Sequence, residues 1–320
     1  MNVLTADDID FSLYEQETDA QQKVLPASIY LQDFVERLKA PHPKPMPALP
    51  WRKTHDKVAF RPGEVTLWAG ANGSGKSLVT GQVCMTLLAQ NQKVCIASFE
   101  MKPQKTLERM ARQYTGFDGE FLRNHHPEEL PAFFALLDDM KACTSDLWLY
   151  DQQGTVKADR LFAVIRYCAQ ELGVQHFVVD SLMKCVAGDD DYNGQKELTD
   201  KLTALARDHN IHIHLVHHVR KPDDDSKRPT KWDSKGSSAV TDLVDNVMMV
   251  WRNKPKERLI DAGKATDKQM AEPDALLVCD KQRNGDWEGA IGLFFDKTSH
   301  QYLAEYGASP IEYGSAKGFD

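Results

Sequence analysis

Residues 64–90 read EVTLWAGANGSGKSLVTGQVCMTLLAQ, a short apolar run, a glycine-rich turn and a long helix-favouring run in succession. Within them, residues 70–77 fit the pattern G-x-x-x-x-G-K-[ST] of a phosphate-binding loop. In such a loop, backbone N–H groups curl around phosphate oxygens, and the start of the next helix adds partial positive charge. We therefore expect nucleotide contacts from Gly70, Ala71, Asn72, Gly73, Ser74, Gly75, Lys76 and Ser77.

Two side chains of this loop have expected roles in binding ATP or another nucleoside triphosphate. Lys76 should reach the β- and γ-phosphates, and Ser77 should bind Mg²⁺. The alternative is an ordinary glycine-rich turn before a helix. The apolar strand that enters the loop and the helix that leaves it favour the phosphate-binding interpretation.

The chain alternates between strand-like and helix-like segments from residue 51 onward. Short apolar runs predict strands at 64–70, 93–100, 146–151, 176–181, 211–218, 245–252 and 275–283, and helical periodicity predicts helices at 76–90, 103–114, 129–142, 157–172 and 195–209. Such alternation predicts an α/β fold, with a mainly parallel twisted sheet covered by helices on both faces. Two further runs, IGLFFD and QYLAEY, predict a C-terminal β-hairpin.

Two acidic residues end predicted strands. Asp180 follows HFVV, a β-branched run typical of a buried central strand. Because the carboxyl ends of parallel strands line the ligand crevice, we expect Asp180 to bind Mg²⁺; a helix N-cap is the alternative. Glu100 ends the strand after the phosphate loop, which suits a general base for an attacking water; a cap for the helix near Pro103 is the alternative.

The net charge excludes a globally basic nucleic-acid coat protein. The 320 residues include 39 Lys and Arg against 47 Asp and Glu, which gives −8. Six carboxylates and no basic residue lie in residues 1–20, so the other 300 residues carry only −2. Most of the excess acid therefore lies in the N-terminal segment and leaves room for a local basic surface.

Composition divides the chain into four segments. Residues 1–24 are expected to be an acidic mobile tail, 25–50 a linker helix with a proline-rich linker, 51–306 the main domain and 307–320 a C-terminal tail. The helix has apolar residues at helical spacing, so it must dock either on its own body or on a neighbouring subunit. No segment predicts a membrane span or signal peptide, and the six cysteines indicate reduced core thiols, so we expect a cytoplasmic protein.

The order of these motifs resembles RecA-type hexameric replicative helicases of the DnaB-like family, and more closely the helicase half of phage primase–helicases and the mitochondrial helicase. The similarity runs through RPGEVTLWAGANGSGKS, SFEMKPQKTLERMARQ, HFVVDS, HLVHHVRKP, WDSKGSSAVTDLVDNVMMVWRN and KQRNGDWEG, within residues 50–304. The resemblance implies a RecA-like P-loop NTPase core. It also implies that the helix near 28–39 docks on the next subunit of a ring.

The resemblance assigns further residues to the catalytic site. It implies that Glu100 is the catalytic base, that His218 senses the γ-phosphate, and that Lys281 and Arg283 act on the nucleotide of the adjacent subunit, Arg283 as an arginine finger. A planar guanidinium suits that task because it presents several donors to a phosphate. The family positions that sandwich the nucleotide base align with Arg252 and Phe295.

DNA contacts are expected from two segments that would face a central channel. Residues 219–235 carry a net charge of +2, and their candidates are Arg220, Lys221, Lys227, Arg228, Lys231 and Lys235. A solvated mixed-charge loop is the alternative. In the aspartate-rich segment 186–194, only Asn193 and backbone N–H groups suit a phosphate backbone.

These features predict an NTP-driven replicative helicase that binds ATP and Mg²⁺, moves 5′ to 3′ on single-stranded DNA and unwinds duplex DNA as a homo-oligomeric, hexameric ring. A polymerase, a primase or a single-strand-binding protein would be its partner in a bacterial or phage-infected cell. Two alternatives stay open: another RecA-type DNA-dependent ATPase, such as a recombinase or loader, and a nucleotide-gated replisome scaffold.

Overall fold

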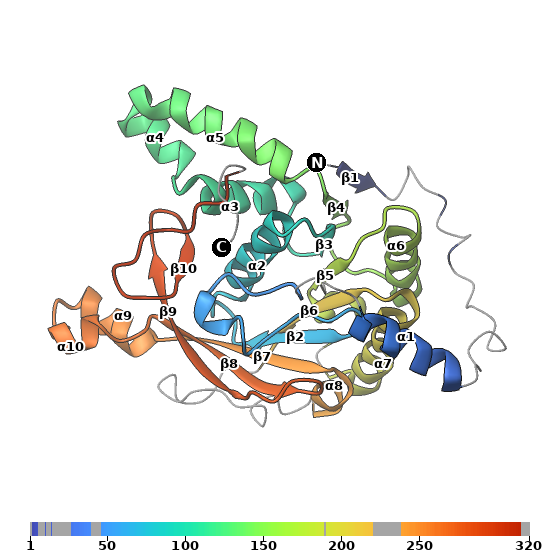
Figure 1. Cartoon of the computed structure of the whole chain (residues 1–320). Helices are drawn as coiled ribbons and strands as arrows, with labels where there is room; N and C mark the ends of the chain where they lie inside the picture. The colour runs from blue at the N-terminus through green and yellow to red at the C-terminus, as the bar shows by residue number, and fades with distance from the viewer. Residues whose placement is uncertain are drawn as a thin grey trace.

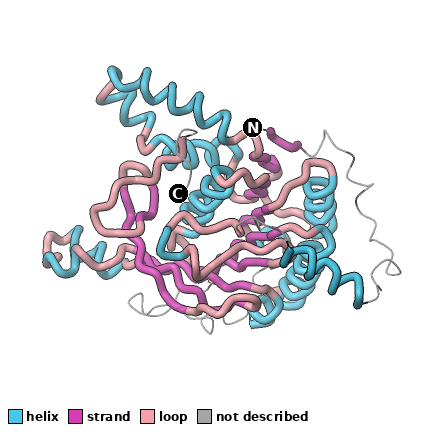
Figure 2. The backbone as a smooth tube through the Cα atoms, in the orientation of Figure 1, coloured by secondary structure: helices cyan, strands magenta, loops and turns pink. Residues whose placement is uncertain are grey.

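A ten-stranded sheet runs through the protein. The computed structural model describes residues 2–5, 10, 14, 27–39, 46–188, 190–219 and 238–314. The strand order is β1-β4-β3-β5-β6-β2-β7-β8-β9-β10, and the strands lie between helices (Figures 1 and 2). All pairs from β1 to β7 are parallel, and β7 to β10 pair antiparallel. The strands are β1 (Asn2–Thr5), β2 (Val65–Gly70), β3 (Val94–Ser98), β4 (Leu147–Asp151), β5 (His176–Asp180), β6 (His212–His218), β7 (Asn246–Arg252), β8 (Ala275–Gln282), β9 (Gly289–Asp296) and β10 (Gln301–Leu303).

Helices fill most of the connections between the strands. They are α1 (Ala27–Lys39), α2 (Lys76–Ala89), α3 (Pro103–Thr115), α4 (Gly119–His125), α5 (Leu130–Cys143), α6 (Ala158–Gln170), α7 (Tyr192–His209), α8 (Ser238–Leu243), α9 (Lys254–Asp261) and α10 (Asp267–Met270). The seven predicted strands, the five predicted helices and the C-terminal hairpin are confirmed, with ends that differ by a few residues. Among the described helices, none combines the length and apolar character that a bilayer crossing needs.

Each face of the sheet has its own hydrophobic core. Along β2, Val65, Leu67 and Ala69 belong to one core, which includes buried residues of α6 and α7. Trp68 belongs to the other, with residues of α2 and α3. The alternation follows from the two-residue period of a strand, and each large side chain so buried contributes about 1.5–3 kcal/mol. The prediction of helices on both faces is confirmed.

Residues on both sides of the expected main domain, 51–306, pack against it. Leu49, in the expected linker, is fully buried, and the Gln90 side chain exchanges hydrogen bonds of 2.9 and 3.0 Å with the backbone of Ala48. At the other end Tyr313 is buried, and Gln301 exchanges hydrogen bonds of 2.7 and 2.9 Å with the backbone of Ile311. Proline prevents regular structure in these segments, but it does not prevent an apolar side chain from packing.

Short elements were missed because they are too short to display a period. Residues 2–5, expected within the mobile tail, pair with β4 as strand β1. Helix α4 begins after Asp118, whose carboxylate accepts two backbone N–H groups. Helix α10 has a capping box formed by Thr266 and Gln269. All six cysteines are free thiols, and five of them are buried.

Three histidines form a buried cluster on the side of the sheet that carries Trp68. Trp68 Nε1 donates to His214 Nδ1 at 3.2 Å, and His214 Nε2 lies 3.2 Å from His176 Nδ1. The His212 ring lies 4.7 Å from that of His214, and the edge of Phe60 packs on the cluster. Burial lowers the pKa of all three histidines, that of His212 to about 4. The cluster is therefore neutral in the folded protein.

The protein should lose stability as the pH falls below about 6.5. The three histidines become protonated in the unfolded chain at this pH, whereas the buried imidazoles of the folded protein stay neutral. The stabilisation is fully present above the unfolded pKa. It declines towards pH 4 by about 1.4 kcal/mol per pH unit for each proton taken up on unfolding. Urea denaturation at pH 7, 6 and 5 measures this. His212→Gln should reduce the slope. Equal stability at pH 7 and pH 5 would contradict the interpretation.

Candidate active site

The phosphate-binding loop joins β2 to α2. Gly73 and Gly75 have φ of 73° and 93°, a left-handed conformation that side chains rarely adopt, so glycine is required at both positions. The Ser74 N–H donates to the Ala71 carbonyl at 3.1 Å and closes the turn. The Ser74 hydroxyl is buried and has no hydrogen-bond partner among the described residues. The loop therefore has the curled backbone and spare polar groups that a phosphate group needs.

Lys76 lies under this turn and is almost completely buried. Its ammonium group donates to the carbonyls of Gly70 at 2.8 Å and Ala71 at 3.0 Å. Desolvation lowers the pKa of Lys76 to about 8, although the carboxylates of Asp180 and Glu100 oppose the shift. A buried ammonium that donates to two neutral carbonyls at the loop is well placed to bind phosphate oxygens.

Asp180 and Ser77 face each other beside the loop. The Ser77 hydroxyl donates to Asp180 Oδ2 at 3.2 Å. Burial raises the pKa of Asp180 to about 6, and the negative charge of Glu100 adds to the shift. A hydroxyl and a carboxylate with this geometry offer the hard oxygen ligands that Mg²⁺ prefers. The residues present therefore fit a magnesium ion.

Glu100 lies beside Asp180 and close to His218. Its Oε1 accepts a hydrogen bond from the Ser181 hydroxyl at 3.0 Å and lies 3.6 Å from His218 Nε2. Burial, followed by the positive charge of Lys76, lowers the pKa of His218, so the imidazole is largely neutral at pH 7. Sequence reasoning missed the contact of Ser181 with Glu100, because a serine after a strand has no distinctive pattern.

Strand register explains why these residues meet. Asp180 pairs with Ser98 on β3 and with Val216 on β6, and Gly70 on β2 pairs with His218. The carboxyl ends of β2, β3, β5 and β6 therefore stop at the same edge of the sheet. This is the edge at which open α/β sheets bind their ligands.

Of the two candidates for contact with the nucleotide base, Arg252 lies directly at the loop. Its Nη1 donates to the Gly73 carbonyl at 3.3 Å, and Glu257 holds its Nε. Phe295 lies further from the loop, behind Tyr302, the residue opposite it in the hairpin. The ring centroids of Phe295 and Tyr302 are 5.1 Å apart. Tyr302 itself packs against Gly75 and was not singled out from the sequence, although its position across the predicted hairpin could have suggested it.

Lys281 and Arg283 lie at the far end of the sheet. On β7 and β8, Arg252 pairs with Ala275 near the loop, and Asn246 pairs with Gln282 at the opposite end. The two end residues of β7 are six residue steps apart, which corresponds to about 20 Å. Neither cation belongs to the phosphate site of its own chain. This position agrees with the expectation that they act on a neighbouring subunit.

The candidate DNA-contacting residues are less fully described. Asn193 is exposed in the first turn of α7, after the helix cap Asp191, and so lies in a helix where a loop was expected. The six basic candidates of 219–235, namely Arg220, Lys221, Lys227, Arg228, Lys231 and Lys235, lie outside the described residues. Their role stays a prediction.

Comparison with known proteins agrees with this arrangement. A family model described as "DnaB-like helicase C terminal domain" matches residues 55–304. The chain belongs to this family. One solved structure, described as an ATPase domain, is 14% identical, with a TM-score of 0.69, over 90% of this chain and 99% of that chain. A DnaB-like replicative helicase, whose structure was reported with its interactions with primase, is also 14% identical with a TM-score of 0.69, over 88% of this chain and 67% of that chain.

Membership of the DnaB-like family confirms the resemblance and the RecA-like fold class. It supports a helicase and nucleotide-hydrolysing enzyme, and it supports nucleotide binding, generally with Mg²⁺. DnaB-like helicases form oligomers and bind single-stranded DNA.

Gly75→Ala should destabilise the protein more than Gly73→Ala. Both substitutions impose a left-handed φ on alanine, at a cost of about 1–2 kcal/mol. At Gly73 a new Cβ meets no atom within 4 Å, whereas at Gly75 it would overlap the Tyr302 hydroxyl. Thermal denaturation compares the two. Tyr302→Phe should restore part of the loss in the Gly75→Ala background only. Equal losses at the two positions would exclude the steric explanation.

Proposed function

We propose that this chain is an ATP-driven motor that moves 5′ to 3′ on single-stranded DNA and unwinds duplex DNA as a hexameric ring. One observation carries the proposal. The phosphate loop, Asp180 and Glu100 converge at one edge of the sheet, while the candidate arginine finger lies about 20 Å away at the other end of β7. A site built in this way is completed by the finger of a second copy.

Each residue of the site has a task in hydrolysis. Lys76 and the loop N–H groups bind the β- and γ-phosphates, and Ser77 with Asp180 would hold Mg²⁺. The ion supplies positive charge against the phosphate oxygens. Glu100 orients the attacking water and accepts its proton on a carboxylate oxygen, while Ser181 fixes that carboxylate from the other side. His218 lies next to Glu100, where its second partner would be the γ-phosphate.

Assembly is supported by the linker helix α1. Leu31 and Leu38, one heptad apart on α1, are 63% and 70% exposed, and Phe34 and Val35 are also exposed. Burying such a stripe on another surface is favourable by about 25 cal/mol per Å². Residues 40–45, which lie outside the described residues, contain three prolines, a composition typical of a linker.

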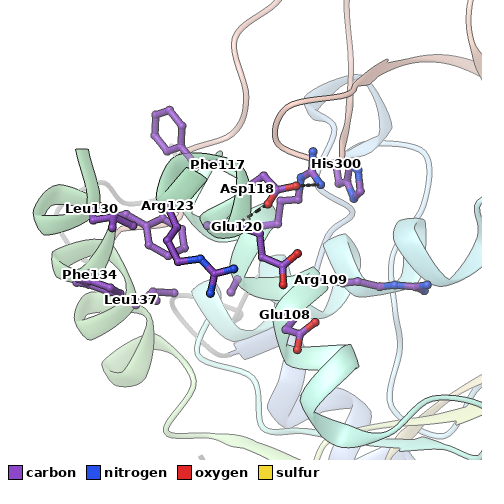
Figure 3. A pocket seen from close by; sticks show the side chains of 14 residues that line it. Glu108, Arg109, Phe117, Asp118, Glu120, Arg123, Leu130, Phe134, Leu137 and His300 are labelled. Atoms are coloured by element: carbon purple, nitrogen blue, oxygen red, sulfur yellow. Dashed lines mark hydrogen bonds and ion pairs between the residues drawn. The ribbon is translucent and has the colours of Figure 1, made fainter. Parts of the chain in front are cut away.

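A hollow of about 570 Å³ lies between α3, α4 and α5 (Figure 3). Leu130, Phe133, Phe134 and Leu137 of α5 are apolar lining residues, and charged residues of α3 and α4 also line it. In Figure 1, α4 and α5 project away from the sheet. We infer that α1 of one subunit occupies this hollow on the next.

Glu100→Gln should bind nucleotide but lose hydrolysis by a factor of about 10²–10⁴, because the amide cannot accept the proton of the water. Lys76→Ala should lose nucleotide binding itself. DNA-stimulated ATP hydrolysis and binding of a fluorescent ADP analogue separate the two effects. Glu197→Gln, on an exposed face of α7, is the matched control and should resemble the wild type.

Unwinding of forked DNA with a 5′ tail or a 3′ tail tests the direction. Wild-type hydrolysis by Glu100→Gln would contradict the assignment of the base. DNA-stimulated hydrolysis without fork unwinding would indicate a different RecA-type ATPase.

Replacing Leu31 and Leu38 together by Ser should reduce the assembly to the 36.1 kDa monomer, because the apolar contact between subunits is lost. Phe134→Ser, in the hollow, should have the same effect, whereas Gln32→Ala on the polar side of α1 should not. Light scattering during gel filtration with a non-hydrolysable nucleotide measures the mass. A full-size assembly formed by both apolar variants would refute this docking.

A further inference from the structure

Asp245 is a buried carboxylate outside the phosphate site. It lies between α8 and β7, and its side chain is 4% exposed. Its Oδ2 accepts the backbone N–H of Val65 at 3.0 Å, and its own backbone N–H donates to the Val65 carbonyl at 3.0 Å. Val65 is the first residue of β2, the strand that leads to the phosphate loop. The carboxylate is therefore fixed to the strand that carries its own nucleotide site.

The second oxygen of Asp245 faces two guanidinium groups. Its Oδ1 lies 3.3 Å from Arg283 Nη1 and 3.5 Å from Arg207 Nη2. The backbone of residue 245 also holds the finger strand, since the Arg283 N–H donates to the Asp245 carbonyl at 2.9 Å. Arg283 Nη2 donates in addition to the Leu243 carbonyl at 3.3 Å, at the carboxyl end of α8.

The same place holds the second candidate cation. Lys281 Nζ donates to the carbonyls of Thr241 at 2.9 Å, Asp242 at 2.9 Å and Val244 at 2.8 Å. Carbonyls at the carboxyl end of α8, the negative end of its dipole, therefore bind both cations, and the Asp245 carboxylate adds a full charge beside Arg283. The Lys281 ammonium has three N–H donors and donates to three carbonyls. The Arg283 guanidinium has five N–H donors, and its contacts with Asp245 and Leu243 leave some of them for a phosphate.

We propose that Asp245 is the positioning residue of Arg283 for hydrolysis at the neighbouring subunit's nucleotide site; this rests on the proposed function of Arg283 in a ring. Isolated charges are rarely buried, and here the cost is offset by a backbone hydrogen bond and two arginines. The result is a negative charge with a fixed position on one edge of the guanidinium. This charge orients the opposite edge of the Arg283 guanidinium outward. Because Asp245 is also hydrogen-bonded to Val65, it links the orientation of Arg283 to β2 of the same subunit.

Asp245→Asn keeps an oxygen for the Val65 N–H but removes the charge that orients Arg283. We expect a fall in kcat of tenfold or more in DNA-stimulated ATP hydrolysis, because small displacements of a transition-state contact are costly, with KM for ATP changed by less than about twofold. Arg207→Gln removes the other partner of the same carboxylate and should leave both constants unchanged. Wild-type kcat in Asp245→Asn would overturn the proposal.

A double-variant cycle separates positioning from a general structural effect. In the Arg283→Ala background, Asp245→Asn should cause no further fall in kcat, because the group through which it acts is gone. An equal fall in both backgrounds would overturn the proposal. Asp245→Ser serves as the second variant if Asp245→Asn melts below the assay temperature.

Mixed assemblies distinguish failure of this inference from failure of the proposed function. Lys76→Ala subunits have a damaged phosphate loop but an intact finger, so mixing them with Arg283→Ala subunits should restore hydrolysis at some interfaces. Asp245→Asn subunits mixed with Lys76→Ala subunits should behave in the same way. If neither mixture regains activity, the finger does not act between subunits. If only the Arg283→Ala mixture does, Asp245 has another role and the inference fails alone.

Discussion

The parallel register of β2, β3, β5 and β6 is the constraint on which the rest of the site depends. Because Asp180 stands opposite Ser98 and Val216, and Gly70 stands opposite His218, four strand ends stop at one edge. A shift of one residue in any of these pairings would send the affected side chains to the other face of the sheet. The two hydrophobic cores exclude such a shift, because apolar side chains of β2 fill both faces.

The charged side chains of Lys76 and Asp180 at this edge are not fully compensated by opposite charges of the protein. Burial makes the ammonium form of Lys76 less favourable and the carboxylate form of Asp180 less favourable, so their pKa values move towards each other, to about 8 and about 6. A triphosphate beside Lys76 and a divalent cation beside Asp180 would each supply the missing opposite charge. The same desolvation that costs folding free energy therefore favours binding of both groups, as is common at active sites.

Sequence patterns predicted the long elements and the glycine-rich turn between β2 and α2, because apolar periodicity and the G-x-x-x-x-G-K-[ST] pattern are local signals. They placed Asp180 and Glu100 at strand ends, and register then brought these residues together. Tyr302 was missed because its contact with Gly75 joins residues far apart in the chain. The packing of Leu49 and Tyr313 was missed for the same reason, since proline and polar neighbours hide an apolar residue that docks on distant elements.

In the proposed motor, the nucleotide site and the arginine finger of one subunit lie at opposite ends of the same sheet, and the sheet couples them. Lys76 and Glu100 lie at one end of the central strands, and Arg283 lies at the other, held by Asp245 against the first residue of β2. A rigid strand of six residues thus joins the nucleotide site of one subunit to the cation proposed to act on the next. In the proposed ring, a shift of β2 on nucleotide binding would pass to Asp245, and from it to the Arg283 guanidinium, through one strand and its hydrogen bonds.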